Sequence, residues 1–378
     1  MSIKKLIECD DFVIIYGKKF HYVWLYNNSC VWKSNPLSKG FQLHIKEGSV
    51  IPKIPKPLSI KIDEANDEEQ LIIEWNEEAD QKSIFSISWL LSNAYDPEPE
   101  LLHDQKVLWD KVWLDEHPQI SYDFRAERDL WMNQLSQLGF TLLRNIDFQN
   151  LETFAQSIGP LTLYANYDPI MTIKYIPTSV SATDSNNFLR LHTDWSFMES
   201  SLLVTIQYCL ENSVVGGESI LVDGFRVCND FCQDYPEYGK ILSEFPVEFW
   251  HFTEPEFEYL FSQKKTIIKQ NHKGEVTEIC FSDKDCKILV NFNQTEQFYK
   301  AYATLSKYIH NPKYYYQYKM QPGDCFLMQN WRIIHGRQSF QPNSGYRELK
   351  TLYIDWQYFM ASKRFKQHKN LYTPEHWV

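Results

Sequence analysis

The sequence predicts a mainly β protein with decorating helices, in which a small β-rich domain precedes a double-stranded β-helix, or jelly roll. Short runs of β-branched and aromatic residues, separated by turn-prone residues, occur through most of the chain. Helical periodicity is confined to a few segments, one of which interrupts the later runs. Many short strands with occasional helices are typical of a jelly roll built from two sheets.

The composition indicates a folded protein with an acidic surface. The chain has 378 residues, of which 43% are hydrophobic and 16% aromatic, so it can bury a large core. Its formal net charge of −11 would repel phosphate backbones, which argues against nucleic acid as a partner. No apolar run approaches the roughly 20 residues that cross a bilayer, and no apolar signal region is evident, so no membrane association is expected. Eight cysteines without CxxC or disulfide-framework spacing fit a reducing cytoplasm.

The first part of the chain reads as a small β-rich domain, which we predict to span residues 1–96. Its predicted strands are Phe12–Ile15, Phe20–Leu25, Leu58–Ile62, Leu71–Trp75 and Ile84–Trp89. Two prolines in the stretch Asp96–Pro99 break any regular element, so the second domain is expected to span residues 97–378.

Three helices are expected at the start of the second domain. The first is predicted over Leu101–Leu114, and the second over Phe124–Leu138, where apolar residues form one stripe that ends at Gly139. Asn150 is a candidate cap for a third helix that continues to Ile158.

Strands dominate from residue 161 onward, and one long helix, Thr295–Ile309, interrupts them. The predicted strands are Leu202–Leu210, Ser219–Val222, Pro246–Phe252, Thr266–Gln270, Val276–Phe281, Tyr314–Met320, Cys325–Asn330 and Leu349–Trp356. In a jelly roll, residues far apart in the sequence meet between the two sheets.

A histidine and an aspartate two residues apart are the first candidates for chemistry. Alternate side chains of a strand point the same way, so His192 and Asp194 would project together while Thr193 points away. A second histidine, His335, ends another predicted strand. Two histidines and one carboxylate on one face of an octahedron leave three neighbouring positions open, as non-haem Fe(II) oxygenases need for a co-substrate and dioxygen. The pattern therefore predicts an Fe(II) site.

An arginine beyond the second histidine is a candidate for binding 2-oxoglutarate. Arg347 follows His335 by twelve residues, and the other downstream histidines lack an arginine ten to fifteen positions later. A guanidinium can bind a carboxylate through two parallel hydrogen bonds. Ser219, on a predicted strand, is a candidate hydroxyl donor to the same carboxylate. Arg337 is too close to His335 for this role, and we expect it to form a structural salt bridge.

These residues belong to segments that resemble the gamma-butyrobetaine and trimethyllysine hydroxylase family, which is related to taurine dioxygenase. The segments are Trp24–Asn28, Leu191–Asp194, Val215–Phe225, Asn330–Arg337, Arg347–Leu349 and Tyr353–Trp356. The resemblance spans nearly the whole chain, with its most specific motifs in the second half. It implies that His192, Asp194 and His335 bind Fe(II) and that Arg347 and Ser219 bind 2-oxoglutarate. The implied reaction is hydroxylation of a C–H bond with O2 as the other co-substrate.

The resemblance also implies a substrate site and marks where this chain departs from its relatives. Tyr167, Trp195 and Tyr353 stand where the family has aromatic residues around a cationic substrate, and Asp184 could pair with a substrate ammonium. Met171 stands where an aromatic residue is expected. The cysteines and histidine that hold a structural zinc in relatives are missing from the matching stretches 29–34 and 75–80, so we expect no structural zinc.

The sequence leaves the substrate open. The first expectation is a hydroxylase of a small amine, betaine or amino-acid-like molecule. The alternatives are a taurine-type sulfonate or phosphonate hydroxylase, which would need a second cationic group for which Arg190, Arg226 and Arg332 are candidates, and a non-catalytic metal-binding relative acting as a sensor or interaction protein. A homodimer is a further expectation, taken from the family.

Overall fold

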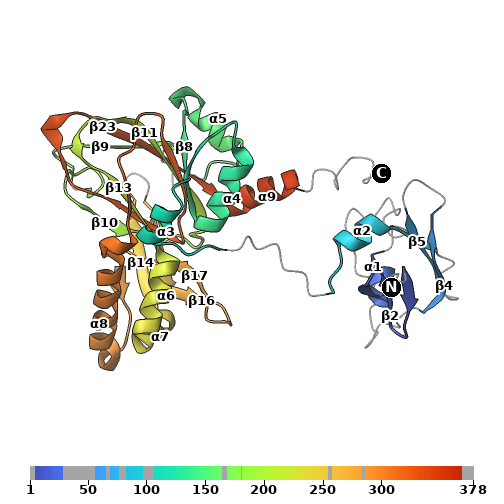
Figure 1. The fold of residues 1–378 in the computed structure, drawn as a ribbon. Helices are drawn as coiled ribbons and strands as arrows, with labels where there is room; N and C mark the ends of the chain where they lie inside the picture. The colour runs from blue at the N-terminus through green and yellow to red at the C-terminus, as the bar shows by residue number, and fades with distance from the viewer. Residues whose placement is uncertain are drawn as a thin grey trace. The chain divides into compact units, whose positions relative to one another are not determined.

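The structure, a computed structural model, describes two compact units (Figure 1). Residues up to 96 form the first unit and residues from 106 form the second. The described residues are 5–28, 56–64, 69–75, 82–96, 106–163, 168–179, 181–253, 258–282 and 286–367. The predicted domain boundary adjoins the stretch 97–105, which lies outside the described residues, and it stays a prediction.

The described part of the N-terminal unit contains two antiparallel three-stranded sheets and two short helices. The sheets contain β1 (Leu6–Glu8), β2 (Phe12–Ile15) and β3 (Lys18–His21), and β4 (Pro57–Asp63), β5 (Gln70–Trp75) and β6 (Lys82–Ser86); the helices are α1 (Tyr22–Asn27) and α2 (Ile87–Ser92). The strands predicted over 20–25 and 84–89 were too long, because a helix begins inside each run. In the second run the Ser86 hydroxyl accepts a hydrogen bond from the Trp89 amide at 3.2 Å and so caps α2.

The second unit is a jelly roll of a six-stranded and a four-stranded sheet, as predicted. The larger sheet has the strand order β7 (Ser121–Asp123), β8 (Phe140–Arg144), β20 (Cys325–Gln329), β11 (Leu203–Asn212), β23 (Arg347–Asp355) and β9 (Met171–Lys174). The smaller sheet has the order β10 (Leu189–His192), β21 (Ile333–Arg337), β13 (Ser219–Asp223) and β19 (Tyr316–Tyr318). Three more small sheets are β12 (Val215–Gly216) with β22 (Phe340–Gln341), β14 (Val247–Phe252) with β15 (Leu260–Lys265) and β18 (Cys286–Ile288), and β16 (Ile268–Gln270) with β17 (Val276–Ile279).

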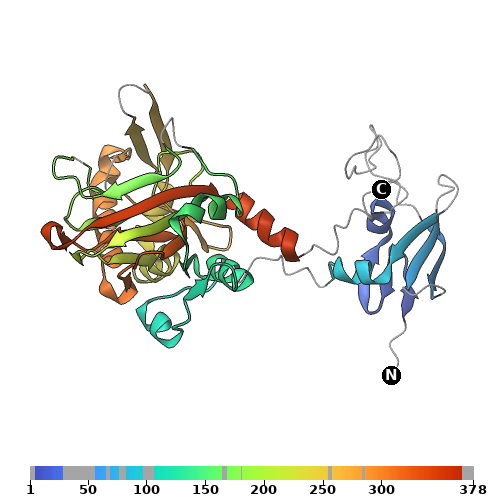
Figure 2. The same cartoon turned by 90° about the horizontal axis from the view of Figure 1, so that it is seen from above.

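Helices cover the outer faces of the two sheets (Figure 1). The helices of this unit are α3 (Lys111–Glu116), α4 (Arg128–Leu138), α5 (Leu151–Gln156), α6 (Gly224–Asp234), α7 (Pro236–Glu244), α8 (Phe292–Ile309) and α9 (Trp356–Gln367). Buried residues of α4, α5 and α9 pack against the larger sheet, and those of α6, α7 and α8 pack with the smaller sheet. Figure 2 shows α9 continuing directly from β23.

The strand alternation separates the outer cores from the space between the sheets. Leu352 and Ile354 of β23 pack in the outer core, whereas Leu349 packs in the inner one. In the smaller sheet, Ile334 packs outside and Leu221 inside. Because side chains alternate along a strand, the odd-numbered residues of β21 and β23 face the space between the sheets.

Several helices differ from their predictions for identifiable reasons. Residues 106–110 of the predicted first helix are not helical, because the Trp109 amide donates to the carboxylate of Asp223 and the helix begins only after Asp110. The predicted cap Asn150 was wrong, since it makes no side-chain capping bond and the carboxylate of Asp147 caps the preceding turn. The end of α4 at Gly139, with a left-handed φ of 82°, was predicted correctly. Helices α6, α7 and α9 were not predicted.

No helix in the described part of the chain is long and apolar enough to span a bilayer.

Candidate metal centre and co-substrate site

The two histidines and the aspartate of the predicted metal site lie together at one end of the smaller sheet. His192 and His335 are directly opposite each other on the neighbouring strands β10 and β21, with ring centroids 4.7 Å apart. Asp194 follows β10, and its carboxylate oxygens lie 3.4 Å from Nε2 of His192 and 3.5 Å from Nε2 of His335. One ligand atom from each of the three residues lies within 4.8 Å of the other two, so one metal ion can contact all three.

Each histidine is held so that its Nε2 atom points toward this shared space. The Nδ1 atom of His192 lies 2.8 Å from the carbonyl oxygen of Arg190. A ring that donates one N–H to a carbonyl leaves the other nitrogen as a neutral, lone-pair donor. Burial also lowers the pKa of His335 to about 4, which keeps this ring neutral near pH 7.

The aspartate is ionised and oriented by neighbouring hydroxyl groups. Burial alone would favour the protonated form of Asp194, but His335, His192 and the Tyr353 hydroxyl together hold its pKa well below the usual range. The hydroxyls of Tyr353 and Thr205 donate to its Oδ2 atom at 3.1 and 3.4 Å. Two imidazole nitrogens and one carboxylate oxygen are a donor set that suits Fe(II).

A buried asparagine fixes the backbone of the aspartate. The Asn330 side chain accepts a hydrogen bond from the Asp194 amide at 2.8 Å and donates one to the Asp194 carbonyl oxygen at 2.8 Å. It also donates to the carbonyl oxygen of Ser201 at 3.4 Å, and it is 1% exposed. We did not single out Asn330 from the sequence, although it opens one of the motifs that carry the family resemblance.

Replacing Asn330 by alanine is expected to weaken Fe(II) binding about 10–100-fold, the usual cost of losing a group that orients a metal ligand. The Asp194 backbone would lose both of its bonds to the side chain of residue 330. Titration of the purified variant with Fe(II) or Mn(II) measures the effect. Asn311→Ala is the control, because Asn311 only caps a turn after α8. An unchanged metal affinity in Asn330→Ala would contradict this role.

A glycine allows the two histidine strands to approach closely. A Cβ atom on Gly336 would lie 2.5 Å from the carbonyl oxygen of Leu189, so any other residue would push β10 away from β21. Since His192 lies on β10 and His335 on β21, the spacing of the two histidines depends on this glycine.

The candidate 2-oxoglutarate residues lie on facing strands. Arg347 begins β23 of the larger sheet and is 6% exposed, and Ser219 begins β13 of the smaller sheet, also 6% exposed. Within the described residues, neither side chain has a hydrogen-bond partner or an ion-pair partner, and the Nε atom of Arg347 is fully buried. Burial and the nearby Arg337 lower the pKa of Arg347 to about 10. A buried guanidinium without a carboxylate needs an anion.

The expected salt bridge of Arg337 was wrong. Arg337 is 3% exposed and forms no ion pair with a described residue. Its guanidinium donates instead to the backbone carbonyl oxygens of Thr183, Ser185 and Asn187. Two residues after His335 on β21, it faces the space between the sheets.

The candidate substrate residues are only partly brought together. The rings of Trp195 and Tyr353 contact each other, with centroids 3.9 Å apart and planes tilted by 33°. Trp195 adopts a left-handed φ of 50°, which is strained for a residue other than glycine. Asp184 accepts a hydrogen bond from the Ser179 hydroxyl at 2.8 Å. Tyr167 lies outside the described residues. So do the stretches 29–34 and 76–80, on which most of the expectation of no structural zinc was based.

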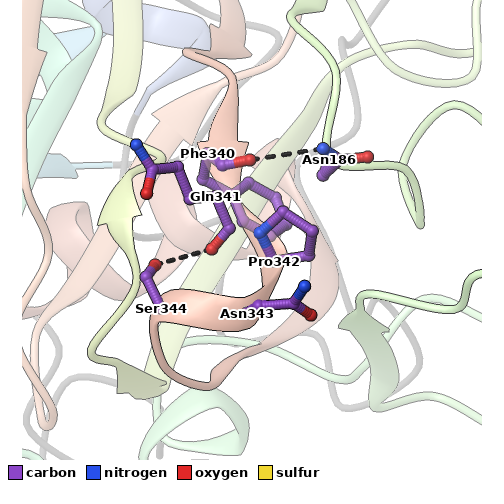
Figure 3. A pocket seen from close by; sticks show the side chains of 6 residues that line it. All are labelled: Asn186, Phe340, Gln341, Pro342, Asn343 and Ser344. Carbon is purple, nitrogen blue, oxygen red and sulfur yellow. Dashed lines mark hydrogen bonds between the residues drawn. The ribbon is translucent and has the colours of Figure 1, made fainter.

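A pocket of about 430 Å³ lies beside Phe340 (Figure 3). Its lining residues are Asn186, Phe340, Gln341, Pro342, Asn343 and Ser344. None of these is a metal ligand or a titratable group, so this pocket is not the reaction site.

Comparison with known proteins agrees with the geometry. Residues 117–353 match the family described as taurine catabolism dioxygenase TauD, TfdA family. Gamma-butyrobetaine dioxygenase of Homo sapiens is 26% identical over 315 residues, which cover 79% of this chain and 80% of that protein. The mitochondrial trimethyllysine dioxygenase of Bos taurus is 24% identical over 377 residues, covering 91% and 83%. The solved structure of PvcB, an Fe, alpha-ketoglutarate dependent oxygenase, superposes with a TM-score of 0.45 at 14% identity, covering 63% of this chain and 82% of that one.

A jelly roll that brings two histidines and one aspartate to a single small space defines the class of non-haem iron, 2-oxoglutarate-dependent oxygenases. Since the family match extends over more than half of its length, the chain belongs to the TauD/TfdA dioxygenase family. It is an enzyme of the dioxygenase class that acts on a small molecule.

Proposed function

We propose that this enzyme hydroxylates a C–H bond of a small amine, betaine or amino-acid-like substrate, with His192, Asp194 and His335 holding Fe(II). The convergence of the three ligand atoms within 4.8 Å is the observation that carries the proposal. The relatives named for gamma-butyrobetaine and trimethyllysine support this substrate class.

The protein side chains would position the metal and the co-substrate, and the metal would provide the chemistry that oxidises the substrate. Bound Fe(II) would use 2-oxoglutarate and O2 to oxidise the substrate, with succinate and carbon dioxide as the other products. His192, Asp194 and His335 would hold this ion, and a two-histidine, one-carboxylate set would leave it able to bind the co-substrate and oxygen. Tyr353 and Thr205 hold the Asp194 carboxylate in place, and Asn330 holds its backbone.

Arg347 and Ser219 are proposed to bind the carboxylate of 2-oxoglutarate that lies away from the metal. Replacing Arg347 by alanine is expected to weaken 2-oxoglutarate binding by at least about 10-fold, because one hydrogen bond to a charged group is worth about 1.5–3 kcal/mol and 1.4 kcal/mol is tenfold in affinity. Calorimetric titration of the Mn(II)-loaded protein with 2-oxoglutarate measures this loss, and a metal titration should show unchanged affinity.

The control for this prediction is Arg226→Ala. Arg226 pairs with Asp110 and Asp230 and contacts none of the site residues in the described structure. Equal losses of metal and 2-oxoglutarate affinity in Arg347→Ala would show that Arg347 is structural.

The substrate pocket is proposed to differ from an aromatic cage that surrounds a cation. Trp195 and Tyr353 are too close to admit a cation between them, since a cation over a ring lies within about 6 Å of its centroid and still needs its own thickness. The Tyr353 hydroxyl is already bonded to Asp194. Trp195, Asp184 and Tyr167 stay the candidates for contact with a cationic substrate. Met171, opposite Thr351 on the inner face, places a thioether where relatives have a ring.

The structure offers little support for a sulfonate or phosphonate hydroxylase, the first alternative. Two of its candidate cations are engaged elsewhere: Arg332 is fully buried against Asp223, and Arg226 pairs with Asp110 and Asp230. Arg190 is exposed. The second alternative, a non-catalytic relative, gives no reason to keep a buried Arg347 that has no carboxylate partner among the described residues, together with the proposed ligands His192, Asp194 and His335.

Succinate release tests the proposal. The full chain is loaded with Fe(II) and 2-oxoglutarate without oxygen and then exposed to oxygen together with trimethylammonium, amino-acid or sulfonate compounds. We expect an amine, betaine or amino acid to accelerate succinate release and to gain one oxygen atom by mass spectrometry. Acceleration by sulfonates or phosphonates alone would favour the first alternative, and no succinate with any compound would favour the second.

For the cellular setting we propose a homodimer in the cytoplasm without a nucleic-acid partner. The net charge of −11 supports the last point. Light scattering of the full chain tests the dimer, and fluorescence microscopy of a tagged chain tests the location.

A further inference from the structure

Arg337 has a second hydrogen-bonding edge that no described residue uses. Its Nε atom is buried and has no hydrogen-bond partner in the described part of the chain. Arg337 lies directly opposite Ser219 on β13, so both side chains project from the same face of the smaller sheet. That is also the face of His335, two residues earlier. An unpartnered, buried N–H therefore faces the proposed 2-oxoglutarate site.

Arg337 and Arg347 approach the same ring from the two sheets. The Cζ atoms of Arg337 and Arg347 lie 4.9 and 5.9 Å from the ring centroid of Phe340. Both Nε atoms are buried without a partner. The carboxylate of Asp184 acts on Arg337 at longer range, but it forms no ion pair with it. Two buried like charges with unused donors are best stabilised by an anion that accepts from both.

The other edge of Arg337 holds the loop that leads into the first metal-ligand strand. Its amino groups donate to the carbonyl oxygens of Thr183 at 3.3 Å, Ser185 at 2.7 Å and Asn187 at 2.8 Å. Asn186 of the same loop is bonded in both directions to the backbone of Phe340, at 3.0 and 3.3 Å (Figure 3). The loop 181–188 ends where β10, the strand of His192, begins.

We propose that Arg337 is a second 2-oxoglutarate-binding arginine that links the co-substrate to the loop 181–188. The Nε–H of Arg337 donates to the 2-oxoglutarate carboxylate that Arg347 also binds. Its amino groups keep their hydrogen bonds to the carbonyl oxygens of the loop. Binding of the dicarboxylate thus orders the loop, and an ordered loop in turn raises dicarboxylate affinity, because such coupling is reciprocal. The inference rests on the proposed function, since it needs 2-oxoglutarate in this site.

The test compares three variants of the full, Mn(II)-loaded chain with wild type. Calorimetry gives the affinity for 2-oxoglutarate, and hydrogen exchange gives the protection of residues 181–188 with and without it. In wild type, 2-oxoglutarate should slow exchange in the loop. Arg337→Gln should bind 2-oxoglutarate at least about 10-fold more weakly, because it loses one hydrogen bond to a charged group. In this variant 2-oxoglutarate should no longer slow hydrogen exchange in the loop. Arg226→Gln, the same substitution away from the site, should match wild type.

Asn186→Ala separates a direct contact from general loosening of the loop. This variant removes the side-chain bond to Phe340 but keeps the Arg337 guanidinium, so it should lose clearly less affinity than Arg337→Gln. Equal losses in the two variants, wild-type affinity in Arg337→Gln, or wild-type loop exchange indifferent to 2-oxoglutarate would each overturn the inference. Failure of wild type to bind 2-oxoglutarate at all would instead overturn the proposed function. Unchanged Mn(II) affinity in each variant shows that the fold is intact.

Discussion

Replacing Asp194 by alanine is expected to weaken Fe(II) binding by more than about 100-fold and to abolish succinate formation. Groups that only orient a metal ligand already contribute about 10–100-fold to affinity, so loss of the ligand itself must cost more. Asp194 supplies the only negative charge among the three proposed ligands, and both histidine Nε2 atoms face it at 3.4 and 3.5 Å. Metal titration and a succinate assay under saturating Fe(II) measure the two effects.

The matched control is Asp115→Ala, which removes a carboxylate from the exposed side of α3. The Asp115 side chain is 65% exposed and pairs only with Lys111 one turn earlier. This control should keep both metal affinity and activity. Wild-type metal affinity in Asp194→Ala would rule out the three residues as the metal centre, whatever happened to activity.

The largest expected loss of stability comes from Asp223→Ala. The carboxylate of Asp223 and the guanidinium of Arg332 are both fully buried, with contacts of 3.0 and 2.8 Å. Removing one partner of a buried pair leaves an uncompensated charge and costs about 3–5 kcal/mol. Asp223 also accepts the amide hydrogens of Trp109 and Phe225, which would lose their partner. Urea unfolding of the metal-free protein should show the loss.

Two further variants give this stability prediction its controls. Asp115→Ala removes an exposed pair and should change the free energy of unfolding by less than about 1 kcal/mol. The double variant Asp223→Leu with Arg332→Met removes both charges and should be clearly more stable than Asp223→Ala, because no buried charge is left alone. A double variant as unstable as the single one would show that the backbone bonds of Asp223, and not its charge, are decisive.

The closeness of His192 and Asp194, two of the proposed metal ligands, could be predicted because it depends on local geometry. His192 and Asp194 are two residues apart at the end of a strand, so the sequence alone places them on one side. Arg347 was predicted from its distance along the chain to His335. The bonds of Asn330 to Asp194 and of Arg337 to the loop carbonyls could not be predicted in this way. They join segments far apart in sequence, and nothing in local spacing shows which backbone groups they meet.

The fold shows the same division between local and tertiary information. The end of α4 at Gly139 was readable because a glycine in a left-handed conformation ends helices. Helices α6 and α7 were missed although their start signals are present: Asp223 caps α6 and Pro236 opens α7. Helix α9 was missed because it follows β23 without a break, so the apolar run gave no sign of the change.

Because β10 is an edge strand of the smaller sheet, bound iron would stabilise the fold in addition to its part in the reaction. A marginal strand has only one neighbour, and here that neighbour is β21, which contributes the other histidine. An ion that bridges the two strands would stabilise β10 against local unfolding, which is easiest at a sheet edge. Removal of the metal by a chelator should therefore expose β10 to proteases before the rest of the jelly roll. The lifetime of the protein during iron shortage would then depend on how often β10 unfolds locally.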